Sequence, residues 1–141
     1  MDADERLMAA AGGVRSGPQT AEYLERNLRH WSEHGFGIWI LRDPITRQVV
    51  GRAGLRHLTI QGMEEVELAY ALFPEFWGRG LATDVARACV TIGRDWLGFH
   101  SVVGLVLPGN LASQRVLQKA SLTREREVTL DGQLHLLFRT D

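Results

Sequence analysis

The sequence is poor in the residues that form covalent or metal cross-links. Its 141 residues include one cysteine, Cys89. A single thiol cannot close a disulfide within the chain or build a thiolate metal site, so both kinds of framework are excluded. The chain also has no apolar run of the roughly 18 residues that a membrane span needs, and no signal-peptide pattern. We therefore expect a cytoplasmic protein with no membrane partner.

Charge of either sign is not in excess. The 16 Lys and Arg against 17 Asp and Glu give a net charge of −1. No bulk positive field is then available to hold phosphate backbones, which excludes general nucleic-acid binding. The four prolines and the hydrophobic fraction of 45% also exclude global disorder. The length fits one domain over residues 1–141.

Hydrophobic periodicity and turn residues divide the chain into helices and strands. Helices are expected at 20–34, 81–97 and 112–120. Strands are expected at 36–41, 48–58, 64–73, 101–107, 124–130 and 133–139. The pattern predicts an α+β fold with a mixed, mostly antiparallel sheet of about six strands flanked by helices. Strands 64–73 and 101–107 are expected to run parallel, joined by a right-handed crossover through the helix between them.

Glycine is the one residue in excess, with 15 among 141. Gly78, Gly80 and the small Ala82 connect the strand at 64–73 to the helix at 81–97. Glycines let a ligand approach the backbone, and the first N–H groups of a helix have no intrahelical partner. The loop therefore predicts an anion site, with phosphate as the natural ligand. A Gly-x-Gly alone can also be an ordinary tight turn, and neither the dinucleotide-binding pattern nor the P-loop pattern fits.

Three polar residues lie close to this loop in the predicted sheet. Glu67 alternates with Ala69 and Ala71 on one strand face, so that face is expected to be covered; the alternative is a rim position in solvent. Asn110 and Ser113 follow the strand at 101–107 and open the next helix. A ligand-binding role and helix capping are both compatible with these two residues.

Other patterns are better explained by packing. His30, Glu33 and His34 match the spacing of a zinc peptidase motif, but the helix ends at Gly35 and its dipole favours basic residues there, so no metal site is expected. The apolar stripe of the helix at 81–97 includes Cys89 and Trp96. Both are therefore expected in the core.

Two segments carry a family resemblance. Residues 67–83 and, about thirty residues further on, residues 110–119 together resemble the GNAT superfamily of acyl-CoA N-acyltransferases, and most closely its ribosomal-protein N-terminal acetyltransferase (RimJ/RimL-like) type. The family's loop has Gln or Arg, two residues, Gly, one residue, then Gly or Ala. Gly80 and Ala82 match, whereas Trp77 takes the first position, as in RimJ/RimL-like members. The resemblance extends from about Pro18 to Arg139 and implies a GNAT-like sheet whose parallel pair splays apart.

The resemblance implies acetyl-CoA as cosubstrate and a primary amine as acceptor, without a metal. The backbone N–H groups of one loop would hold the pyrophosphate: Gly78, Arg79, Gly80, Leu81, Ala82 and Thr83. The peptide groups of Ala71, Leu72 and Phe73 would pair with the pantetheine arm like an added strand, and Asn110 would hydrogen-bond that arm.

For catalysis, the resemblance and elementary acid–base chemistry indicate Glu67 as the general base, acting directly or through water. Such a modest base suits a peptide N-terminal α-amino group (pKa about 7.7 to 8.0) better than a lysine (about 10.4). The family's thiolate-protonating tyrosine would be residue 117, which is Leu117 here, so Ser113 is the remaining donor. Two alternatives stay open: acetylation of a small amine such as a polyamine or antibiotic, and a non-catalytic acyl-CoA-binding module.

The comparison with the family also predicts that its first strand is lacking, because only Met1 to Asp4 precede the equivalent point. The sheet should then begin at 36–41 with an edge that is either paired across a homodimer or left open. Residues 12–19 are expected to line the acceptor pocket. Ser121 and Leu122 replace the family's usual Gly-Phe, which affects the local turn and not the chemistry.

Overall fold

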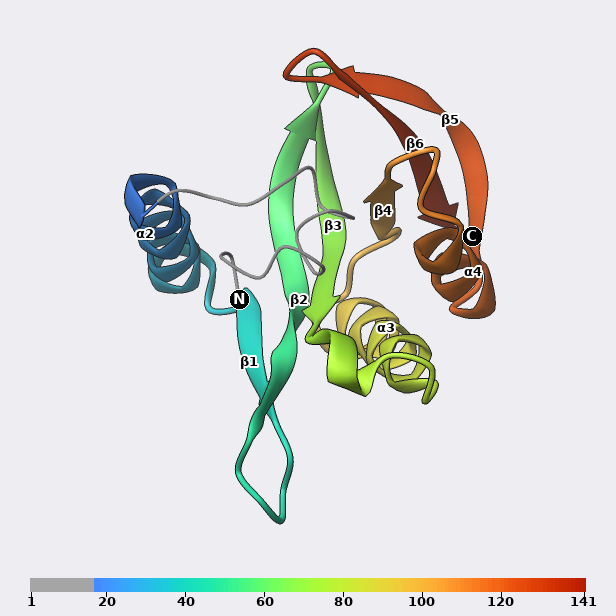
Figure 1. Cartoon of the computed structure of the whole chain (residues 1–141). Coiled ribbons are helices and arrows are strands. Elements are labelled where there is room, and N and C mark those ends of the chain that lie inside the picture. The colour runs from blue at the N-terminus through green and yellow to red at the C-terminus, as the bar shows by residue number, and fades with distance from the viewer. Residues whose placement is uncertain (1–16) are drawn as a thin grey trace.

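Six strands lie in the order β1-β2-β3-β4-β6-β5 in the computed structural model, which describes residues 17–141 (Figure 1). The helices are α2 (Gly17–His34), α3 (Leu81–Thr91) and α4 (Leu111–Lys119), with a 3-10 turn at Pro74–Phe76 and a π-helical turn at Ile92–Trp96. The strands are β1 (Ile38–Arg42), β2 (Val49–Ile60), β3 (Met63–Leu72), β4 (Val103–Val106), β5 (Leu122–Leu130) and β6 (Gln133–Thr140). The expected α+β fold with its mixed six-stranded sheet is confirmed.

The sheet consists of two antiparallel halves joined at one point. β1, β2 and β3 form a meander, and β6 pairs with both β4 and β5. The halves meet in parallel through the single residue pair Glu67 and Val103. Past this pair β3 and β4 diverge, as Figure 1 shows. The expected splayed parallel pair is therefore present.

One expectation about the crossover helix is wrong. The regular helix ends at Thr91, and the five residues after it form the π-helical turn. A wider turn rotates the following side chains relative to the apolar stripe. Trp96 is consequently 81% exposed and not in the core. Cys89 lies before the change and is buried as expected, and desolvation raises the pKa of its thiol to about 11.

Ring nitrogens attach α2 to the sheet. His30 Nδ1–H donates to the Phe36 carbonyl at 2.8 Å, and His30 Nε2 accepts from the His57 backbone N–H at 2.9 Å. Trp31 Nε1–H donates to the Ile38 carbonyl at 2.9 Å. These three bonds tie the last turns of the helix to the segment that follows it and to β2.

Some expectations lie partly or wholly outside the described residues. Among residues 17–141, β1 is an edge strand, while the lacking first strand and most of the expected pocket lining concern residues 1–16. Homodimer formation stays a prediction. No helix within the described range is long and apolar enough to cross a membrane.

Acid is expected to weaken the attachment of α2. Burial, as the largest cause, holds the pKa of both His30 and His57 below the usual value, so the folded chain favours neutral rings. The unfolded chain takes up protons more readily, and the free energy of unfolding should therefore fall as the pH drops below about 6.5. Urea denaturation at pH 7.5 and pH 5.5 measures this difference.

The matched controls are His30→Asn and His135→Asn. Only the first removes a histidine that must stay neutral to accept the His57 N–H. The ring of His135 is half-buried and contacts the Gln133 carbonyl, an acceptor that does not require a neutral ring. We expect the pH difference to shrink in His30→Asn and to persist in His135→Asn. Equal stability of the unmodified chain at both pH values would contradict the prediction.

Candidate functional site

The loop between β3 and α3 presents unpaired N–H groups. Gly78 and Gly80 have φ values of 75° and 76°, in the left-handed region that glycine adopts without strain. Gly80 is the N-cap residue and offers no side chain to the helix, whose first bond runs from Asp84 N–H to the Gly80 carbonyl. Within residues 17–141, the three N–H groups at positions 81–83 have no acceptor. The loop therefore has the donors that an anion needs.

Aromatic side chains hold this loop on the end of β3. Trp77 Nε1–H donates to the Leu72 carbonyl at 2.9 Å, and Phe76 is buried. The Arg79 guanidinium carbon lies 5.5 Å from the centre of the Phe76 ring. The loop is thus anchored on one side, while the space above Gly78 and Gly80 is open.

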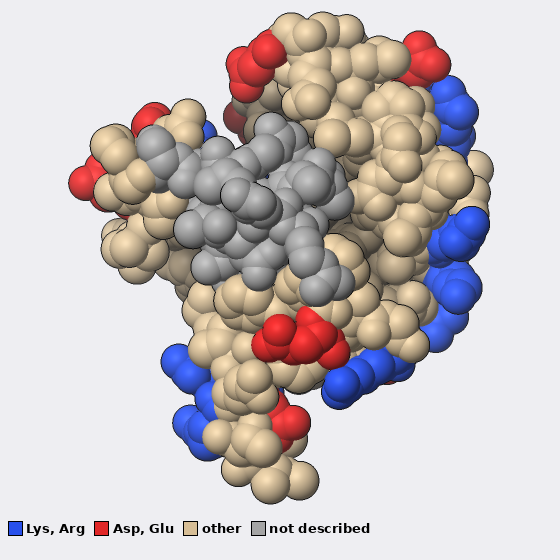
Figure 2. Space-filling model, in the orientation of Figure 1, with Lys and Arg blue, Asp and Glu red and all other residues tan. Residues whose placement is uncertain are grey.

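Positive charge gathers near this loop. Figure 2 shows Lys and Arg side chains along the rim of the molecule beside α3 and α4. The exposed basic residues of the loop and the two helices are Arg79, Arg87, Arg115 and Lys119. Glu75 and Asp84 of the same segments are also exposed, so four basic residues face two acidic ones and leave a modest local excess of positive charge.

The gap between β3 and β4 exposes one edge of β3. Phe73 N–H donates to the Val50 carbonyl of β2, and in an antiparallel ladder alternate residues bond to the same neighbour. The peptide groups of Ala71 then face β2, whereas those of Tyr70 and Leu72 face the gap. Trp77 occupies the Leu72 carbonyl. The Leu72 N–H and both peptide groups of Tyr70 are consequently placed to receive an added strand.

Glu67 is buried with a cationic partner. Its exposed fraction is 7%, so its face is covered as expected and the solvent-rim alternative is wrong. Arg56, its cross-strand neighbour, donates from Nε to Oε2 and from Nη2 to Oε1, both at 3.3 Å. The negative charge of Glu67 is the main reason that the pKa of Arg56 is raised. The ion pair was not predicted from the sequence.

The structure separates the roles of Asn110 and Ser113. Asn110 Oδ1 accepts from the Ser113 backbone N–H at 3.1 Å, so Asn110 caps α4. The hydroxyl of Ser113 is not a cap. It lies 2.6 Å from the hydroxyl of Tyr70, a residue that the sequence pattern does not single out. Burial raises the pKa of Tyr70, which keeps its phenol protonated.

Glu67 and Tyr70 point to opposite faces of the sheet, because they are three positions apart on a regular strand. Glu67 shares its face with Arg56 and Arg52 of β2, and Arg52 lies 4.6 Å from the ring centre of Tyr23 on α2. Tyr70 packs on the other side, against the cluster that contains buried residues of α3. The gap thus has a carboxylate on the α2 face and two hydroxyl groups on the α3 face.

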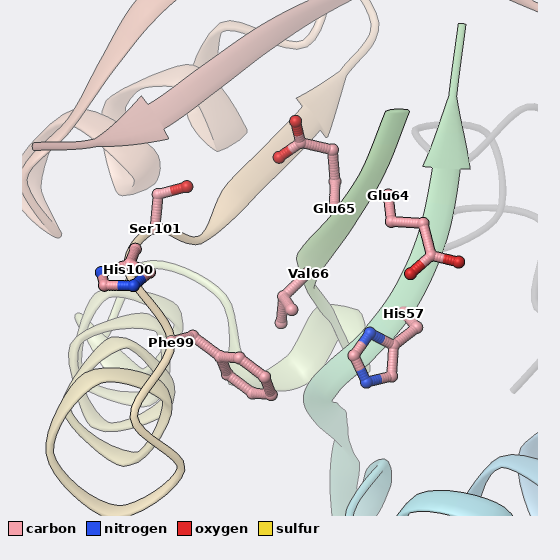
Figure 3. Close-up of a pocket in the computed structure, with 7 residues that line it drawn as sticks. All are labelled: His57, Glu64, Glu65, Val66, Phe99, His100 and Ser101. Carbon is pink, nitrogen blue, oxygen red and sulfur yellow. The ribbon is translucent and has the colours of Figure 1, made fainter. Parts of the chain in front are cut away.

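Two other features lie apart from this gap. The ring nitrogens of His30, His34 and His57 lie within 4.8 Å of one another, but both nitrogens of His30 already bond to backbone groups. This arrangement favours packing of α2 over metal ligation. A hollow of about 230 Å³ lies at the start of β3, the end opposite the glycine loop (Figure 3). Its lining is His57, Glu64, Glu65, Val66, Phe99, His100 and Ser101.

Known proteins resemble this chain in sequence and in fold. Residues 1–123 match the family model described as "Acetyltransferase (GNAT) domain". The YkkB protein of Bacillus subtilis strain 168 is 31% identical over 119 residues, which cover 84% of this chain and 69% of YkkB. YoaA of the same strain, named an uncharacterized N-acetyltransferase, is 30% identical over 62% of this chain and 49% of its own. A crystal structure of the acetyltransferase from Agrobacterium tumefaciens strain C58 has a TM-score of 0.86 at 25% identity, covering 99% of this chain and 80% of that one.

A negative charge placed in the glycine loop is expected to block anion binding. In Gly80→Glu a carboxylate would stand where a phosphate would lie, and we expect CoA affinity, measured by calorimetry, to fall by about tenfold or more. Gly132→Glu is the matched control. Gly132 has almost the same φ, 77°, and equal space around it, but lies in the β5–β6 hairpin. Unchanged CoA affinity in Gly80→Glu would place the site elsewhere.

Proposed function

This chain belongs to the GNAT acetyltransferase family, and from that premise we propose that it transfers the acetyl group of acetyl-CoA to a primary amine in a ternary complex. The observation that carries the proposal is the uncapped start of α3 beside the unpaired edge of β3. The first feature suits a pyrophosphate and the second suits an extended pantetheine arm. We further propose that residues 1–141 act as a single domain of this type.

The cosubstrate would bind along β3 and α3. The N–H groups from Gly78 to Thr83 would hold the pyrophosphate. In the segment from Ala71 to Phe73, the Leu72 N–H faces the gap and would bond the pantetheine arm. Asn110 uses its Oδ1 to cap α4, so its side-chain NH2 would be the group that reaches the arm.

The amine would approach the thioester from the face of Glu67. As nitrogen attacks the carbonyl carbon, Glu67 would accept the amine proton directly or through a water molecule. The C–S bond would then break with its electron pair on sulfur, and Ser113 would supply the proton that completes the thiol. The thiol has a pKa of about 8.5, so this step needs only modest assistance.

The Arg56 ion pair bears on the choice of acceptor. Arg56 keeps the Glu67 carboxylate in place through two hydrogen bonds. A fixed carboxylate of this kind is a modest base, and a modest base is sufficient for an amine that loses its proton easily. An α-amino group is about 2.5 pKa units more acidic than lysine, a difference of roughly 3.4 kcal/mol. We therefore propose a protein or peptide N-terminus as the acceptor, as in RimJ/RimL-like enzymes.

Release of CoA thiol from acetyl-CoA tests the function. The panel contains a peptide with a free N-terminus, the same peptide with a blocked N-terminus and a free lysine, and a polyamine. Thiol release with the first peptide alone is the expected result. Release with the polyamine alone would redirect the acceptor to small amines. CoA binding without release with any amine would indicate a binding module.

Removal of the Glu67 charge is expected to slow turnover. Glu67→Gln preserves the shape of the side chain but not its basicity, so kcat should fall by about 10²- to 10⁴-fold with little change in CoA affinity. Steady-state kinetics and calorimetry measure the two quantities.

The matched control is Glu65→Gln. Glu65 lies two residues earlier on the same strand and is also a mostly buried carboxylate paired with an arginine, Arg139, at 2.8 and 3.0 Å. Both variants remove the carboxylate of an arginine–glutamate pair, although Arg139 keeps a second partner in Glu125. Only Glu67 borders the point where the strands part. Equal loss of kcat in both variants would attribute the effect to the broken ion pair and contradict the role of Glu67.

A further inference from the structure

Tyr70 and Ser113 form a short hydrogen bond across 43 residues of sequence. Their hydroxyl oxygens are 2.6 Å apart, at the short end of the usual range for O–H···O bonds. Tyr70 comes from β3, and Ser113 is the third residue of α4. Both side chains are half-buried, on the face of the sheet opposite Glu67.

Either hydroxyl can donate in the short contact. The described partners of the Tyr70 hydroxyl are the Ser113 hydroxyl at 2.6 Å and the Ser113 carbonyl at 3.4 Å. The carbonyl contact is longer than the usual O–H···O range of about 2.5 to 3.0 Å, so it competes weakly for the phenol proton. When Tyr70 donates in the short contact, the hydroxyl proton of Ser113 is free to point away from Tyr70.

We propose that Tyr70 is the positioning residue for Ser113: it donates a hydrogen bond to Ser113 Oγ and so directs the Ser113 proton toward the sulfur of the leaving CoA. This inference rests on the proposed acetyl transfer. It gives Tyr70 on β3 a role in the reaction that acts through Ser113 on α4.

The proton balance of the step is complete. When the tetrahedral intermediate collapses, the C–S bond breaks and its electron pair goes to sulfur. Sulfur takes the proton of Ser113 Oγ, and Oγ takes the phenol proton of Tyr70. The phenolate regains a proton from water after CoA leaves. The products are an amide and a thiol, with no oxidant, reductant or metal involved.

The position of Leu117 explains why a second hydroxyl is useful. Leu117 is 1% exposed, and its side chain packs on Gly104 of β4, where a Cβ would meet it. Residue 117 therefore fills the core and offers no donor to the gap. After giving its proton to sulfur, Ser113 alone would be left as a poorly stabilised alkoxide. A neighbouring phenol, with a pKa near 10, can donate its own proton to Ser113 and carry the negative charge instead. Burial raises the pKa of Tyr70 further, which keeps the donor proton in place at neutral pH.

The test is a double-mutant cycle with Tyr70→Phe, Ser113→Ala and the combined variant. Tyr70→Phe keeps the ring and removes only the hydroxyl. We expect kcat to fall by about 10- to 100-fold in Tyr70→Phe, with an unchanged KM for acetyl-CoA. In the Ser113→Ala background the same change should alter kcat by less than about twofold, because Tyr70 acts only through Ser113. Thermal unfolding of each variant shows whether it is folded.

Each outcome decides the inference. If Tyr70→Phe lowers kcat by the same factor with and without Ser113, Tyr70 has a general structural role and the inference is wrong. If Tyr70→Phe retains full kcat while Glu67→Gln is impaired, the inference fails and the proposed function stands. If the unmodified chain releases no thiol with any amine of the panel, both fail together.

Discussion

The divergence of β3 and β4 is the constraint on which the site depends. Buried peptide groups need hydrogen-bond partners, and past the Glu67–Val103 pair β4 no longer supplies them to β3. We propose that a strand-like ligand completes the open edge. The same divergence brings the start of α3 and the start of α4 to the two sides of the gap. The proposed anion site, the exposed edge of β3 and the proposed reacting groups thereby all border the gap.

Strand alternation divides the chemistry between the two faces. Glu67 and Tyr70 are on one strand, but their side chains point in opposite directions. The proposed proton acceptor therefore lies on the α2 face and the proposed proton donors on the α3 face, with the gap between them. Each group also has its own partner, Arg56 for Glu67 and Ser113 for Tyr70. The Glu67 carboxylate is thereby kept apart from the Tyr70 and Ser113 hydroxyls.

Several residues that a motif search would single out have structural duties instead. Asn110 caps α4, and His30 bridges α2 to β2 with both ring nitrogens. Trp77, in the first position of the loop motif, ties the loop to the end of β3. These contacts matter for the proposed function because they fix the position of the backbone groups that would face the ligand. The motif residues therefore include structural supports of the site, such as Trp77 and Asn110, as well as groups that would face the ligand.

The sequence alone determined what depends on neighbours along the chain. Period-two and helical patterns placed the strands and helices, the glycines marked the loop between β3 and α3, and the alternation around Glu67 predicted a covered face. The features that depend on contacts between distant segments were decided only by the tertiary structure. The Arg56 partner of Glu67 follows from strand register, the Tyr70–Ser113 bond from the packing of α4 on the sheet, and the exposure of Trp96 from a π-helical turn. Such contacts are set by register and packing, which no single stretch of sequence specifies.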